Sequence, residues 1–204
     1  MNYLSIFKKR WKLVVLFVIV SLMISLGLSL AQPFQYEAVT RSLVIQKESG
    51  DWDALSAARA AERLSIALAD VIYTNSFFNK VLDSGFNVID DFGTDPEKRL
   101  QKWQRDIKTS VSQETGIITV KAYDNDRQQA NLIVSAISYV LETDGKEYHG
   151  GGQNVVIKTV DAPMVSSSPK RPNLPLNLGM AFGLGLLAGL AFIFLSYREK
   201  KETH

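Results

Sequence analysis

The sequence predicts an α+β protein in which two transmembrane helices bracket one extracytoplasmic domain. Two apolar runs of about 20 residues lie near the two ends of the 204-residue chain, and each is long enough to cross a bilayer. The polar middle, about 140 residues, suffices for one domain with a hydrophobic core. Its segments alternate between strand and helix periodicity. We therefore expect a sheet of about four strands with helices packed on one face.

Composition divides the chain into six segments. They are a cytoplasmic N-terminal tail (1–10), a first transmembrane helix (11–31), an extracytoplasmic domain (32–162), a proline-rich connector (163–175), a second transmembrane helix (176–196) and a cytoplasmic tail (197–204). At about 1.5 Å per residue, each apolar run spans about 30 Å. Lysine and arginine flank the outer ends of both runs. The positive-inside rule then predicts a two-pass protein of the cytoplasmic membrane with both termini in the cytoplasm.

A cleaved signal peptide is the alternative interpretation of the first run. Ser29-Leu30-Ala31 offers small residues at suitable positions for cleavage. The apolar stretch is longer than the usual signal-peptide core of roughly 7–15 residues, which favours a membrane helix. The middle of the chain is extracytoplasmic under both interpretations.

The composition argues against several classes of function. The chain has no cysteine, which excludes disulfides, thiolate zinc sites and cysteine nucleophiles. Its two histidines, His149 beside three glycines and His204 in the tail, form no pair with metal-ligand spacing. A net charge of +2 is too small to indicate nucleic-acid binding. We expect no catalytic residues, no cofactor and no metal, and hence a protein that is not an enzyme.

The middle of the chain is expected to follow the order strand, helix, helix, strand, strand, helix, strand. The strands are expected at 36–46, 107–112, 116–123 and 155–160, and the helices from 51 to about 82 with a possible kink at Asn75, from 94 to 103 and from about 126 to 145. If the first and last strands pair, the chain enters and leaves the domain at one edge. A protein tethered by two membrane helices requires this arrangement.

Acidic residues precede the last predicted helix of the domain. Asp126 and Gln129 have the spacing of a capping box, in which each side chain binds a free N–H group of the first turn. Asp124 and Asp126 also suggest a cation site, but capping explains both residues without a metal. A second helix start is predicted at Thr94-Asp95-Pro96-Glu97.

Glycines and prolines mark the region of the second membrane helix. Gly179 and Gly183 are four residues apart, as are Gly185 and Gly189, a spacing that lets helices approach closely. The alternative is plain exposure to lipid. The prolines of the preceding segment, Pro163, Pro169, Pro172 and Pro175, are typical of an extended, semi-rigid connector, and an ordinary linker is the alternative. With no catalytic group elsewhere, these eight residues are the candidate working surface of the protein.

The chain resembles the Wzz-type polysaccharide co-polymerases, or chain length determinant proteins. The resemblance rests on the membrane–domain–membrane layout, on the strand, acidic turn and helix of residues 116–134, and on the proline segment 161–175 followed by a glycine-rich span. It implies a non-enzymatic role in assembling a surface polysaccharide such as O-antigen, capsule or exopolysaccharide. Copies of the chain would form a homo-oligomeric ring and meet the growing polysaccharide. The resemblance also implies that the eight glycines and prolines of the second-helix region contact sister subunits or the membrane polymerase.

The sequence departs from the larger members of that family. The domain is short, and the tail after the second membrane run is about eight residues long, so we expect neither long inserted helices nor a fused tyrosine kinase. One alternative is therefore an activator of a separate cytoplasmic tyrosine kinase. A two-span extracytoplasmic sensor is an alternative of another class, although so short a tail offers little with which to signal.

Overall fold

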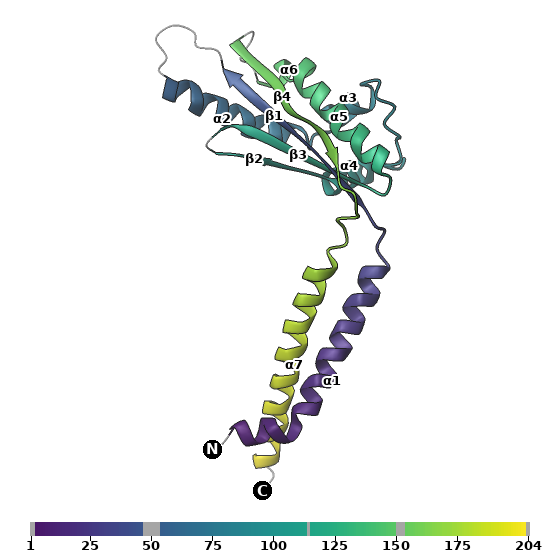
Figure 1. Cartoon of the computed structure of the whole chain (residues 1–204), viewed down its shortest axis with the longest axis vertical. Helices are drawn as coiled ribbons and strands as arrows, with labels where there is room; N and C mark the ends of the chain where they lie inside the picture. The colour runs from purple at the N-terminus through teal and green to yellow at the C-terminus, as the bar shows by residue number, and fades with distance from the viewer. Residues whose placement is uncertain (1–2, 47–53, 114, 150–153, 203–204) are drawn as a thin grey trace. The chain divides into compact units, whose positions relative to one another are not determined.

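The computed structural model describes residues 3–46, 54–113, 115–149 and 154–202. The chain folds into two compact units. One consists of Met1–Phe34 with Arg171–His204, and the other is Gln35–Lys170 (Figure 1).

The first unit is a pair of helices, α1 (Tyr3–Leu30) and α7 (Leu174–Glu202), which run side by side (Figure 1). Each contains a segment long and apolar enough to cross a membrane, Arg10–Leu30 and Leu174–Ser196. Their mean hydropathies are 2.8 and 2.3. These segments coincide closely with the two predicted membrane helices.

The second unit is an α+β domain, as predicted. Its elements are β1 (Tyr36–Gln46), α2 (Ala54–Val71), α3 (Asn75–Leu82), α4 (Pro96–Asp106), β2 (Ile107–Val111), β3 (Ile117–Asp124), α5 (Arg127–Asp144), α6 (Lys146–His149) and β4 (Val155–Val165). The strands form a four-stranded antiparallel sheet in the order β2-β3-β1-β4.

The first and last strands pair, as expected for a domain that is tethered by a membrane helix at each end. Ala38 of β1 lies opposite Val165 of β4, and Gln46 lies opposite Val155. Because the pair is antiparallel, β4 ends where β1 begins. The chain therefore enters and leaves the domain at one end of the sheet.

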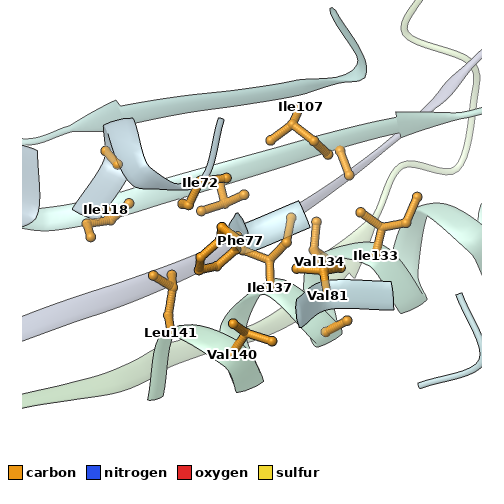
Figure 2. Packing of buried hydrophobic residues seen from close by; sticks show 14 of the residues in the cluster. Ile72, Phe77, Val81, Ile107, Ile118, Ile133, Val134, Ile137, Val140 and Leu141 are labelled. Carbon is orange, nitrogen blue, oxygen red and sulfur yellow. The ribbon is translucent and has the colours of Figure 1, made fainter. Parts of the chain in front are cut away.

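The helices bury one face of the sheet. On β1 the buried side chains are Ala38, Thr40, Ser42 and Val44. Leu68 of α2 belongs to the same core, as do Phe77 of α3 and Ile137 of α5 (Figure 2). Trp103 of α4 is fully buried, and its indole N–H donates a 2.7 Å hydrogen bond to the carbonyl of Ile72. This bond joins α4 to the residue that follows α2.

The possible kink at Asn75 is a break between α2 and α3, because Thr74 is extended and its hydroxyl accepts the N–H of Phe77 as the cap of α3. Other bounds differ from the sequence prediction. Helix α4 continues to Asp106 instead of ending at residue 103. The short helix α6 was not predicted. The last strand continues to Val165 instead of ending at residue 160. The predicted slack at Gly150-Gly151-Gly152 lies outside the described residues.

Candidate functional site

Asp126 and Gln129 do not form a reciprocal capping box. Asp126 is the N-cap of α5, and its carboxylate accepts the N–H of Gln128 at 2.7 Å. The N–H of Asp126 donates to the Asp124 carboxylate, again at 2.7 Å. Gln129 instead accepts the N–H of Ile89 at 3.1 Å and so holds a loop. The expectation for Gln129 was wrong because Asp124, two residues before the cap, already satisfies the N–H that Gln129 would have bound.

Asp124 has the one shifted carboxyl group in the described part of the domain. Burial raises the pKa of Asp124, the hydrogen bond from Asp126 lowers it, and the nearby Asp91 carboxylate raises it further. Among the described residues, no group of three or more metal-ligand side chains of His, Cys, Asp or Glu comes together. The hydrogen bonds that Asp124 and Asp126 accept from backbone N–H groups make them turn and helix caps.

The four prolines do not share one extended connector. Pro163 lies within β4, which is an edge strand with register shifts between Val39 and Ser42 of its partner β1. A sheet tolerates proline at an edge or a bulge because no ladder hydrogen bond is lost there. Pro175 lies in the first turn of α7, where its missing N–H has no helical partner. Only Pro169 and Pro172 lie between the strand and the helix.

The segment after β4 is bonded to the start of β1. The N–H of Ser166 donates to the carbonyl of Glu37, and the N–H of Lys170 donates to that of Gln35, each at 2.8 Å. The side-chain hydroxyl of Ser166 accepts the N–H of Glu37 at 3.0 Å. The proline-rich segment thus begins as part of the domain, because the residues between its prolines provide the N–H groups.

The four glycines of α7 fall into two pairs with different surroundings. A methyl group at Gly185 would lie 2.2 Å from the Ser21 hydroxyl and 2.8 Å from the Cα of Val18. At Gly189 it would lie 2.9 Å from the Cα of Val14. These two glycines therefore pack against α1 of the same chain. Gly179 and Gly183 have nothing within 4 Å of the corresponding position and face away from α1.

Serines of α1 bind α7 along the same contact, a role that was not predicted from the sequence. Ser21 donates to the carbonyl of Ala181 at 2.8 Å, and Ser25 donates to that of Asn177 at 3.2 Å. The amide of Asn177 donates to the Ser29 hydroxyl at 2.9 Å. The three serines are four residues apart, so they lie on one helix face. The four-residue spacing of the serines, together with the small residues of α7, is the sequence feature from which this helix contact could have been predicted.

A groove of about 430 Å³ lies along this serine face. Its polar lining comes from the serines with Gln32 and Asn177, and its apolar lining includes Ile24, Leu28, Met180 and Leu184. Leu28 and Leu184 are 65% and 67% exposed. The helix pair therefore presents a notched, mostly apolar surface beside its internal hydrogen bonds.

The sheet face opposite the helices, which we call the open face, is more apolar than expected. On β1 it presents Val39, Leu43 and Ile45, whereas Thr40 and Ser42 point into the core. Val160 and Met164 of β4 are 48% and 61% exposed. Antiparallel sheets with one solvated face normally place apolar side chains inward and polar ones outward. Part of that pattern is reversed here, so the sheet presents apolar side chains on the face that the helices leave uncovered.

The open face contains a charged hollow of about 400 Å³. Its lining includes two ion pairs, Arg41 with Asp161 at 2.8 Å and Lys121 with Glu37 at 3.3 Å. Tyr123 donates a 2.6 Å hydrogen bond to the same Glu37 carboxylate. The hollow lies near the end of the sheet at which the chain enters and leaves the domain.

Residues 1–87 match the family model for Wzz, the chain length determinant protein. No curated protein matches the chain. The matched residues include the membrane helix α1, strand β1 and helices α2 and α3. The resemblance to the Wzz-type co-polymerase family, predicted from the sequence, is thereby supported by the family match across the first membrane helix and the first part of the domain.

Proposed function

We propose that this protein is a non-enzymatic polysaccharide co-polymerase that regulates the chain length of a surface polysaccharide. The match to the chain length determinant family over residues 1–87 is the observation that supports the proposal most directly. The two apolar helices and the paired first and last strands fit a domain held at a membrane by both ends.

In this proposal several copies form a ring in the cytoplasmic membrane, with both termini inside the cell and the α+β domain outside. The ring acts on the membrane polymerase that extends the polysaccharide, which is an O-antigen, capsule or exopolysaccharide. Gly179 and Gly183 support such contacts, because they leave one side of α7 open to a close neighbour. Gly185 and Gly189 instead hold the two helices of one chain together.

Deleting the gene tests the proposal directly. The surface polysaccharide of the deletion strain is expected to lose its preferred length distribution, and expression of the full chain is expected to restore it. Gel separation of the extracted polysaccharide measures both. An unchanged distribution in the deletion strain would contradict the proposed function.

A further inference from the structure

We propose that the open face of one copy seats the acidic loops at the helix side of the next copy, in a head-to-tail contact that closes the ring. The inference rests on the proposed ring and names the two surfaces that meet within it. The open face is defined by the outward side chains of the four strands. The acidic loops are residues 89–97 and 124–126.

The open face has a positive charge that its own carboxylates do not balance. Its cations are Arg41, Lys108, Lys121 and Lys158 on the strands, with Lys170 in the lining of the hollow, and its carboxylates are Glu37 and Asp161. Residues 35–170 as a whole contain 15 Lys and Arg against 19 Asp and Glu. The excess of negative charge therefore lies elsewhere on the domain, and opposite charge across an interface favours specific pairing.

Two lysines lie directly opposite each other on this face. Lys108 of β2 is the register partner of Lys121 of β3, and like charges in such positions destabilise a sheet. Glu37 offsets Lys121, whereas Lys108 binds only the carbonyl of Gln104 among its described contacts. An external carboxylate at this position would relieve the repulsion.

The acidic loops provide such carboxylates. Asp90, Asp91, Asp95 and Glu97 are exposed, and Asp91 lies close enough to Asp124 to raise its pKa. Asp90 and Asp91 are ion-paired with Arg99 and Lys102 at the edge of the loops. Ile89, which is 60% exposed, adds an apolar side chain that can meet the apolar residues of the open face.

The two surfaces lie near the same end of the sheet, on its opposite faces. Lys121 precedes Asp124 by three residues on β3, which is about 10 Å along a strand. A contact between the open face of one copy and the helix side of the next is heterologous, and heterologous contacts generate closed rings when the rotation between copies closes. A face-to-face pair of open faces would instead oppose two positive surfaces.

Charge reversal in the full-length chain tests the contact. Lys121→Glu and Asp91→Lys should each weaken self-association in detergent, by about tenfold in the protomer concentration at half-dissociation, and the double variant should recover most of that loss. Thr119→Glu, which places a negative charge in the hollow without removing an ion pair, should behave like Lys121→Glu and should also be rescued by Asp91→Lys. Arg63→Glu on the exposed surface of α2 is the matched control.

Mass-resolved light scattering over a dilution series, with thermal unfolding as a check on folding, measures these effects. Normal assembly of both Lys121→Glu and Thr119→Glu would overturn the contact. This holds even if the polysaccharide changed in length, because the open face would then contact the polysaccharide and not a neighbouring copy. Loss of assembly without rescue by Asp91→Lys would also overturn it. A wild-type chain that is monomeric would instead contradict the proposed ring itself.

Discussion

Asp124 is a carboxylate whose surroundings disfavour its charge. It is half-buried at the end of β3, and burial is the main cause of its raised pKa. A folded-state pKa above the unfolded value means that the native state binds more protons between the two values. Stability is therefore lost as the pH rises through that window. At neutral pH the folded protein remains destabilised by the ionised, half-buried carboxylate.

Replacing Asp124 with asparagine should remove this cost while keeping the cap. The amide oxygen can still accept the N–H of Asp126, which the wild-type carboxylate binds at 2.7 Å. We expect Asp124→Asn to leave stability unchanged or to raise it by less than about 1 kcal/mol at pH 7, because solvent screens a half-exposed charge. Relative to wild type, the gain should shrink as the pH falls through the raised pKa. Denaturant titrations at several pH values measure it, and a constant or opposite difference would contradict the assignment.

Gly185 determines how closely the two membrane helices approach. Gly185→Leu should separate them, because even the first side-chain carbon would overlap Ser21 and the backbone of Val18. The chain has no cysteine, so a disulfide between Ser29→Cys and Asn177→Cys reports the pairing, since those side chains are 2.9 Å apart. We expect this cross-link to form in the parent and to be lost with Gly185→Leu.

Gly183→Leu is the matched control for that experiment. It has the same chemistry two residues away, where nothing lies within 4 Å. The cross-link should form as in the parent. If both variants cross-link equally well, Gly185 does not set the helix contact.

At the scale of elements, one buried hydrogen bond links α4 to the end of α2. Trp103 packs against Phe78 and Phe92 and donates to the Ile72 carbonyl at 2.7 Å. Trp103→Phe keeps an aromatic ring but leaves that carbonyl without its partner. The free energy of unfolding should fall by about 1–3 kcal/mol, the cost of an unsatisfied buried group together with some lost packing.

The adjacent Gln104→Ala is the control for this prediction. Its amide donates to the carbonyl of Tyr73 at an exposed position, so the change should stay within about 0.5 kcal/mol. Urea unfolding followed by circular dichroism measures both. Equal effects of the two substitutions would show that burial of the Trp103 bond is unimportant.

Several elements could be predicted because the sequence pattern within each segment is enough to determine its secondary structure. The bounds of β1 and the buried face of α5 follow from alternation and from helical spacing, and the structure has both. The face of β1 that turns inward could not be predicted in this way. Both of its rows contain apolar residues, and only the position of the helices selects the row with Thr40 and Ser42 for the core.

The candidate contacts show the same limit at the scale of the whole molecule. Four glycines at equal spacings form two pairs that sequence periodicity cannot distinguish, because the distinction depends on where α1 lies. The sequence predicts a connector for Pro163 and Pro175 because proline disfavours regular structure. An edge position and a first helical turn are the two places where that penalty is absent.

The open side of α7 yields the last prediction. Gly179→Leu with Gly183→Leu should leave the fold of a single chain intact, since neither glycine touches another part of it. If the proposed ring uses this side for close helix contacts, the larger side chains should lower the mass of the detergent-solubilised oligomer and alter the length distribution of the surface polysaccharide. Light scattering and polysaccharide gels measure the two effects, and the Ser29–Asn177 cross-link confirms that the helix pair is intact. An unchanged oligomer with an unchanged polysaccharide would mean that Gly179 and Gly183 simply face lipid.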